Sequence, residues 1–152
     1  KYMLYETKTA TISLERDVEV LQSYIALEKI RYEDRLELNF KVTENIKNYK
    51  IVPLLLLPLV ENAFKHGASE RVGDVWINID LAIKDNILKF KVSNSKPEHL
   101  PGDIERHKGN IGLPNVRKRL DLLYPGVHEI KVYNEDEMFA IILEIDLGKH
   151  RS

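Results

Sequence analysis

Polar residues of complementary chemistry gather in the segment ENAFKHG, at positions 61–67. If this segment is a helix, at about 100° per residue, four side chains share one face: Glu61, Asn62, Lys65 and His66. A carboxylate can orient or deprotonate a nucleophile, an amide oxygen suits Mg²⁺, and lysine and histidine can neutralise phosphate oxygens. The segment predicts phosphate chemistry, although the solvent face of an ordinary amphipathic helix carries the same residue types.

A second candidate is a glycine-containing segment that comprises Gly109, Asn110, Ile111, Gly112 and Leu113. Glycines let backbone N–H groups approach an anion closely, and a helix that begins here adds a favourable dipole for phosphate. A basic run at 117–119 follows on the next turns. The segment predicts a phosphate cradle, and the entry into a helix would also explain its glycines.

Asn94 is the third candidate, because it follows a strand that we expect to end at Val92 and has Ser93 and Ser95 beside it. An amide at the end of a strand can read the edge of a base by hydrogen bonding. The same residue types are also typical of turns, so the pattern leaves both interpretations open.

The elements that must position these residues follow from the spacing of apolar side chains. Helical spacing predicts helices over 14–32, 54–66 and 113–123, the first with Ser13 or Thr11 as its cap and the last ended by Pro125-Gly126. Alternation predicts strands over 35–43, 75–83, 87–92, 129–133 and 138–146, with a hairpin turn at 84–86. A polar loop fills 93–108. This order predicts an α+β fold, a two-layer sandwich with helices on one face of a mainly antiparallel sheet.

Composition bounds the remaining possibilities. The 152 residues, 43% hydrophobic and 31% charged, suffice for one main domain with a sizeable core. The net charge of -1 gives no electrostatic drive toward nucleic acid, so we expect no direct nucleic-acid partner. The absence of cysteine excludes disulfides and thiol nucleophiles. Since the chain starts at Lys1 and has no signal-peptide pattern, we expect an excised part of a longer protein.

The motifs, taken in order, resemble a known family. PLLLLPLVENAFKHG, then a strand pair that ends in KVSNS, then a polar loop and GNIGLPNVRKRLDLLYPG, resemble the ATP-binding domain of LytS-like sensor histidine kinases. That domain has the Bergerat (GHKL, HATPase) fold. The segment SLERDVEVLQSYIALEKIRYEDRL is similar to the helix that precedes this domain and takes part in dimerisation. The resemblance covers nearly the whole chain.

The resemblance implies a role for each candidate residue. Asn62 matches the asparagine that holds Mg²⁺, and Glu61 matches the adjacent acid that polarises the attacking histidine. Asn94 falls where the family reads adenine, usually with aspartate. The remaining matches face the phosphates of ATP: Lys65, His66, Gly109, Asn110, Ile111, Gly112, Leu113 and Arg119. ATP and Mg²⁺ are the expected cofactors.

Besides Asn110, which stands where the second glycine box often has a further glycine, the sequence departs from the family pattern in two places. The first glycine box, commonly DxGxG, reads NSKPE at 94–98, and an uncharged acceptor at Asn94 contributes less than a carboxylate would. The second departure is the absence of the phosphoacceptor histidine, which in this family precedes the dimerisation helix. We therefore expect 1–33 to be the C-terminal part of a dimerisation region and 34–148 to be the catalytic domain, with an ATP lid at about 95–108.

The leading hypothesis is the catalytic part of a two-component histidine kinase. It would pass the γ-phosphoryl group of ATP to an upstream histidine and then to a response-regulator aspartate, with a LytTR-type DNA-binding domain as one expected feature of that regulator. The resemblance also implies a homodimer, and a cytoplasmic position in a bacterial inner-membrane protein whose membrane segments lie upstream. Two alternatives stay open: a Bergerat-fold serine kinase, and a degenerate nucleotide-binding module that serves dimerisation and docking.

Overall fold

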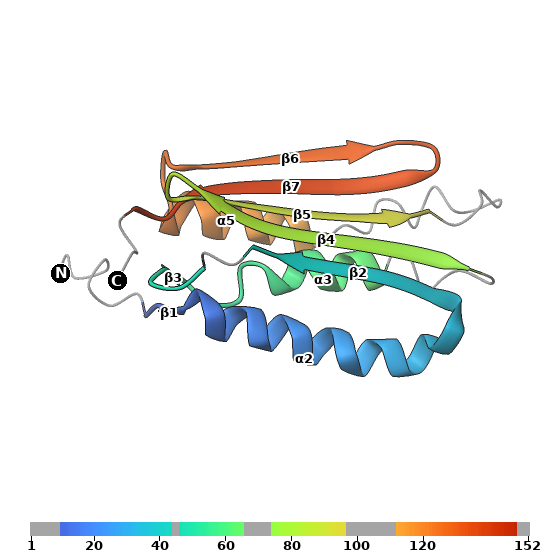
Figure 1. Cartoon of the computed structure of the whole chain (residues 1–152). Coiled ribbons are helices and arrows are strands. Elements are labelled where there is room, and N and C mark those ends of the chain that lie inside the picture. Colours follow the sequence, from blue (N-terminus) through green and yellow to red (C-terminus); the bar gives the residue numbers. More distant parts are fainter. Residues whose placement is uncertain (1–9, 44–45, 66–73, 97–111, 149–152) are drawn as a thin grey trace.

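Figure 1 shows a computed structural model of the chain, which describes residues 10–43, 46–65, 74–96 and 112–148. A five-stranded sheet forms one layer and the helices form the other, on one face of that sheet (Figure 1). The predicted α+β two-layer class is confirmed.

The sheet has the strand order β2-β4-β5-β7-β6. Its strands are β2 (Leu36–Val42), β4 (Val75–Lys84), β5 (Ile87–Ser95), β7 (Met138–Asp146) and β6 (His128–Asn134). The pair β2–β4 is parallel and the other three pairs are antiparallel. A separate two-stranded ladder joins β1 (Ile12–Ser13) to β3 (Lys50–Ile51).

In the described part of the chain, three α-helices cover the inner face of the sheet: α2 (Leu14–Tyr32), α3 (Leu57–Ala63) and α5 (Gly112–Leu123). A short 3-10 helix, η1 (Glu33–Arg35), links α2 to β2. Ser13 caps α2, since its hydroxyl accepts a hydrogen bond of 3.1 Å from the backbone N–H of Arg16. Of the two caps that the sequence offers, Ser13 and Thr11, the structure shows Ser13.

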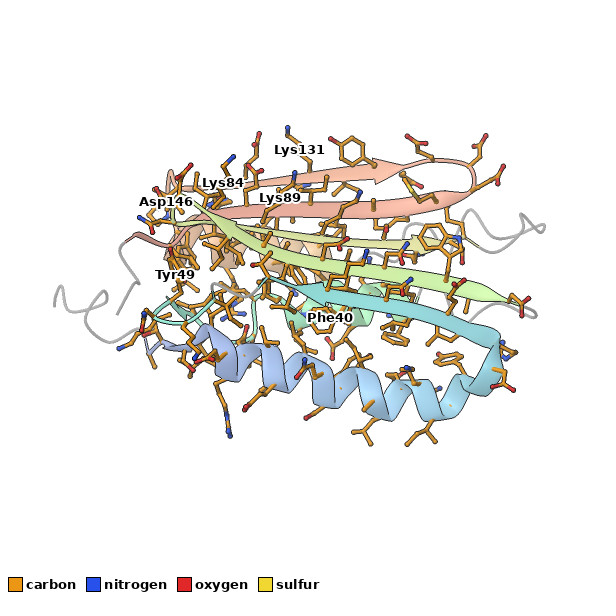
Figure 2. The ribbon with its side chains drawn as sticks, viewed as in Figure 1. Phe40, Tyr49, Lys84, Lys89, Lys131 and Asp146 are labelled. Atoms are coloured by element: carbon orange, nitrogen blue, oxygen red, sulfur yellow. The ribbon has the colours of Figure 1, made fainter. Side chains whose placement is uncertain are left out.

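The two faces of the sheet differ in polarity because side chains alternate along each strand. In β5, Leu88 and Phe90 are buried toward the helices, whereas Lys89 is exposed. Figure 2 shows Lys84, Lys89 and Lys131 pointing away from the helix layer, whereas Phe40 lies on the helix side of β2. The apolar face of the sheet therefore forms the core with the helices, and its polar face points away from them.

The hairpin between β4 and β5 turns through two residues, Asp85 and Asn86, whose φ angles are 54° and 67°. Positive φ at both central positions is the geometry of a type I′ turn, and Asp and Asn tolerate it better than most residues. The predicted hairpin is confirmed. The end of α5 also matches its prediction, since Gly126 follows the helix with a φ of 74°.

Two sequence-based boundaries are wrong. The second helix was expected from residue 54 but begins at Leu57, because Leu54 has a left-handed φ of 66° that an α-helix cannot contain. The strand expected to end at Val92 continues to Ser95, because 93–95 pair with β7. Asn94 therefore lies inside a strand rather than after it.

Helix α2 shares the core of the sheet layer. Leu14, Val18, Leu21 and Ile25 of this helix are at most 5% exposed and belong to the same apolar cluster as the inner residues of β4 and β5. Its other face leaves Leu27 and Ile30 more than half exposed. Within the described ranges, no helix is both long enough and apolar enough to cross a bilayer.

Candidate functional site

Helix α3 presents the predicted polar face. Leu59, Val60 and Ala63 are at most 1% exposed and fix the helix against the core, whereas Glu61 is exposed and Asn62 is half-buried. Lys65, one helical turn beyond Glu61, is also exposed. The helical periodicity thus brings three of the four predicted residues onto the outward side, and His66 lies outside the described residues.

Asn62 carries an unsatisfied polar atom. Its side-chain nitrogen Nδ2 is buried and has no hydrogen-bond partner within the described part of the chain. Buried polar atoms in folded proteins nearly always have partners, and exceptions are found where a ligand supplies the contact. The two ends of an amide are interchangeable in assignment, so either end of this side chain suits a polar ligand. Asn62 therefore fits a ligand-binding position.

Asn94 lies on the helix-facing side of β5, with Ile77 of β4 and Phe139 of β7 as its cross-strand neighbours. It is 1% exposed and occupies the same alternating row as Phe90 and Val92. Its side-chain nitrogen donates a hydrogen bond of 2.8 Å to the backbone oxygen of Ser95. Because the nitrogen is occupied, the side-chain oxygen is the group that can accept a hydrogen bond from a ligand.

The ends of three elements are the places where the candidate residues lie. The C-terminal end of α3, the C-terminal end of β5 and the N-terminal end of α5 lie toward the same end of the helix layer (Figure 1). Helix α3 contacts both β5 and α5. Gly112 and Leu113 form the first turn of α5, and Leu113 is buried. Gly109, Asn110 and Ile111 lie outside the described residues.

Arg119 has partners that the sequence did not reveal. Its Nη1 donates to the backbone oxygen of Leu54 at 2.6 Å and its Nη2 to that of Pro53 at 3.2 Å. The expected contact of Arg119 with phosphate remains a prediction that the structure does not test. What the structure shows is an arginine that joins the middle of α5 to the segment before α3.

Tyr124, just after α5, holds the same segment and was not among the predicted residues. Its hydroxyl accepts a hydrogen bond of 3.0 Å from the backbone N–H of Val52. Burial raises the pKa of this hydroxyl, which therefore stays protonated at neutral pH. Little in the sequence indicated this contact, because a tyrosine next to Pro125-Gly126 is typical of the end of a helix.

Aromatic side chains join α2 to α3. The ring of Phe64 meets Tyr24 at 5.7 Å in an edge-to-face arrangement and meets Tyr32 at 6.0 Å. Burial, together with the negative charges of Glu28 and Glu61, raises the pKa of Tyr24 to about 12. The candidate acid Glu61 is thus electrostatically linked to α2, which the spacing of apolar residues in α2 did not indicate.

No group of three or more histidine, cysteine, aspartate or glutamate side chains in the described residues could hold a metal ion. The amide oxygen of Asn62 is a ligand type that Mg²⁺ accepts, and Mg²⁺ is often held by only one or two protein ligands. The chemistry of Asn62 therefore fits a position that helps to hold such a cation.

Sequence relatives agree with the resemblance. No protein-family model matches the chain. The sensor histidine kinase YpdA of Escherichia coli is 34% identical over 124 residues, which are 77% of this chain and 22% of YpdA. The sensor protein LytS of Streptococcus mutans is 30% identical over 147 residues, 91% of this chain and 25% of LytS. HptS of Staphylococcus aureus is 32% identical over 145 residues, which are 90% of this chain and 28% of HptS.

Solved structures identify the fold. The catalytic domain of the histidine kinase ThkA has a TM-score of 0.64 at 17% identity and covers 91% of this chain and 95% of that domain. Full-length ShkA, solved in complex with AMPPNP, has a TM-score of 0.66 at 13% identity, with coverages of 95% and 32%. ThkA in complex with the response regulator TrrA has a TM-score of 0.62 at 16% identity, and the match covers 91% of this chain and 41% of that one.

This chain has the fold of a histidine kinase catalytic domain. Among proteins with this fold, it is similar in sequence to LytS-like sensor kinases, because sensor kinases named LytS and HptS match about nine-tenths of the chain. The predicted resemblance to LytS-like sensor histidine kinases is confirmed. The chain spans only 22% to 28% of the length of the three relatives described, so it corresponds to one part of such proteins.

Proposed function

We propose that this chain is the ATP-binding catalytic domain of a two-component sensor histidine kinase. In the whole protein it transfers the γ-phosphoryl group of ATP to a histidine that lies outside this sequence. The observation that carries the proposal is Asn62, a half-buried side chain of α3 whose amide nitrogen is buried and has no hydrogen-bond partner among the described residues. Sensor histidine kinases among the relatives supply the reaction class.

Asn62 holds the nucleotide on the side of α3. Its amide faces the phosphates, and bound Mg²⁺ would neutralise the charge that phosphoryl transfer develops on them. Glu61, its neighbour on the exposed face, polarises the attacking imidazole by accepting its proton. Lys65 lies on the same exposed side as Glu61, and both Lys65 and the next residue in the sequence, His66, contribute positive charge to the phosphates.

Asn94 reads the base. Its side-chain oxygen accepts a hydrogen bond from the exocyclic amino group of adenine, while its nitrogen remains bound to Ser95. Guanine has a carbonyl oxygen in the place of that amino group, and two acceptors repel each other. Asn94 therefore favours ATP over GTP.

The first turn of α5 completes the phosphate site. Gly109, Asn110, Ile111, Gly112 and Leu113 lead into this helix, whose N-terminus offers backbone N–H groups and a favourable dipole to an anion. The part of the predicted 95–108 lid that follows the end of β5 at Ser95 serves as the lid over the bound nucleotide. Catalysis then consists mainly of positioning and charge neutralisation, as phosphoryl transfer requires.

The partners follow from the same reaction. The acceptor of the phosphohistidine is an aspartate of a response regulator, in line with the ThkA structure that contains the regulator TrrA. A LytTR-type DNA-binding domain on that regulator fits the LytS-like relatives. Residues 1–33 form the end of the dimerisation region of a homodimer. The catalytic domain works on the cytoplasmic side of a bacterial inner-membrane protein.

Phosphorylation in trans tests the function. The chain is incubated with Mg²⁺, labelled ATP and a separately made segment of the longer protein that carries the phosphoacceptor histidine. We expect acid-labile, base-stable label on that segment, as a phosphohistidine gives, and its loss with Asn62→Ala. Acid-stable label on serine would instead support a serine kinase. Binding of ATP without any transfer to histidine would contradict the kinase assignment.

A further inference from the structure

Two side chains associated with α5 hold three consecutive backbone groups just before α3. Arg119 donates to the carbonyl oxygens of Pro53 and Leu54 at 3.2 and 2.6 Å, and Tyr124 accepts from the N–H of Val52 at 3.0 Å. These groups lie outside any helix or strand, so they need such partners. We call this set of contacts the 52–54 clamp.

The clamp holds an unfavourable backbone conformation. Leu54 has a φ of 66°, although it is neither glycine nor asparagine, and its side chain is 54% exposed. Burial of its own side chain therefore does not compensate for the left-handed conformation, which costs about 1–2 kcal/mol. The two guanidinium hydrogen bonds stabilise it, since hydrogen bonds from a charged donor are among the stronger ones.

Leu54 sets where α3 begins. The residues that follow, Leu55 and Leu56, are fully buried, and the first helical hydrogen bonds run to the oxygen of Leu56 from the N–H groups of Leu59 and Val60. The direction in which the chain enters α3 is therefore fixed at 54–56. Asn62 lies less than two turns further along the same helix.

The other end of the clamp is on the helix that begins at the phosphate segment. Arg119 is about two turns after Gly112, the first residue of α5. The guanidinium thus connects the segment that leads into the Asn62 helix with the helix that begins at the predicted phosphate cradle. Side chains on two different elements must keep a fixed geometry to act on one ligand.

We propose that Arg119 is a positioning residue: it fixes α3 relative to α5 and so places Asn62 for Mg²⁺-dependent nucleotide binding. In this role Arg119 touches the backbone of 53–54 and not the phosphates. The link to nucleotide binding rests on the proposed function, whereas the mechanical link between Arg119 and the start of α3 does not.

The test combines amide hydrogen exchange with calorimetric titration of ATP, in the presence and absence of Mg²⁺. The variants are Arg119→Gln, Arg119→Lys and the control Arg117→Gln, which removes the same charge from an exposed position of the same helix. Without nucleotide, Arg119→Gln should speed exchange at Leu59 and Val60 about tenfold relative to the control, since local opening is governed by local stability. Unchanged exchange overturns the proposal.

The nucleotide measurements separate positioning from direct contact. We expect Arg119→Gln to weaken Mg²⁺-dependent ATP binding about tenfold, Arg119→Lys to restore part of it, and Arg117→Gln to change it less than about twofold. In an Asn62→Ala background, Arg119→Gln should have little further effect, because both changes act through one side chain. Additive losses, or an unchanged affinity of Arg119→Gln, overturn the proposal.

Two further outcomes of these measurements also bear on the role of Arg119. If the wild-type chain binds no ATP, the proposed function fails, while the exchange measurement still decides whether Arg119 holds the start of α3. If Arg119→Gln is too unstable to study, Arg119→Lys takes its place, because one ammonium group can retain one of the two carbonyl contacts. Faster exchange at Leu59 and Val60 in that variant supports the proposal, and exchange equal to the wild type overturns it.

Discussion

The ring of Tyr24 in α2 meets the ring of Phe64, at the end of α3, edge to face with their centroids 5.7 Å apart and the planes at 81°. This contact joins the helix that resembles a dimerisation helix to the helix that carries Asn62. Edge-to-face pairs contribute about 0.5–1.5 kcal/mol beyond the area they bury.

A double-mutant cycle with Tyr24→Leu and Phe64→Leu should therefore show a coupling energy of about 0.5–1.5 kcal/mol. The quantity to measure is the free energy of unfolding from urea denaturation of the wild type, both single variants and the double variant. Replacing the more distant Tyr49 by leucine serves as the control partner for Phe64→Leu. Strictly additive losses for Tyr24 and Phe64 would mean that the two rings do not interact.

Asp17 of α2 is a buried acid whose ionisation opposes folding. It is 4% exposed, its Oδ2 has no hydrogen-bond partner among the described residues, and burial raises its pKa from 3.8 to about 6. Between about pH 4 and pH 6 the folded chain keeps a proton that the unfolded chain has lost, so stability falls as the pH rises through this range. At pH 7 the cost amounts to about 2–3 kcal/mol.

Asp17→Asn should accordingly be about 2–3 kcal/mol more stable than the wild type at pH 7 and nearly equal to it at pH 4. Chemical denaturation across this pH range measures the difference between the two proteins. Asp34→Asn, at an exposed position, should show no such pH-dependent gain. A loss of stability in Asp17→Asn at pH 7 would show that the carboxylate has a partner that stabilises its charged form.

Tyr124→Phe should destabilise the chain by about 1–3 kcal/mol, because it leaves the buried N–H of Val52 without an acceptor. The ring itself, 1% exposed, stays in place, so the change isolates the hydroxyl. Thermal or urea unfolding gives the loss, and Tyr133→Phe, on an exposed tyrosine, is the matched control. Equal stability of Tyr124→Phe and the wild type would mean that the contact with Val52 contributes nothing.

Asn94→Leu should reduce the preference for ATP over GTP, because leucine has the same branched shape as asparagine, although it is larger, and accepts no hydrogen bond. Loss of one such contact between uncharged groups corresponds to about 0.5–1.5 kcal/mol, or about a twofold to tenfold change in the affinity ratio. Titrations of both nucleotides into the wild type and the variant supply the ratio. An unchanged ratio would remove Asn94 from the base-binding site.

Much of the fold could be predicted because it depends on local periodicity. The helix at Leu14–Tyr32 has the predicted bounds, and the strands at β6 and β7 differ by at most one residue at each end. The wrong boundaries depend on contacts between distant residues. Leu54 is left-handed in a segment that Arg119 holds from 65 residues away, and the last residues of β5 are strand because they pair with β7.

For the candidate site too, local features could be predicted from the sequence and contacts between distant residues could not. The shared face of Glu61, Asn62 and Lys65 follows from helical spacing and was therefore accessible from the sequence. The contact of Arg119 with the backbone of 53–54 could not be predicted. A basic run beside a glycine segment indicates phosphate contact and does not reveal a backbone carbonyl in a distant segment. The pairing of β1 with β3 was also missed, since two-residue strands carry no alternation to read.

The most direct test of the central claim is calorimetric titration of the chain with ATP, with and without Mg²⁺, for the wild type and Asn62→Ala. We expect ATP binding that strengthens at least about tenfold when Mg²⁺ is present, and the loss of that increment in Asn62→Ala, since we propose that the amide of Asn62 faces the metal-bound phosphates. ATP binding that is indifferent to Mg²⁺, or an Asn62→Ala variant that keeps the wild-type increment, would contradict the assignment of this site.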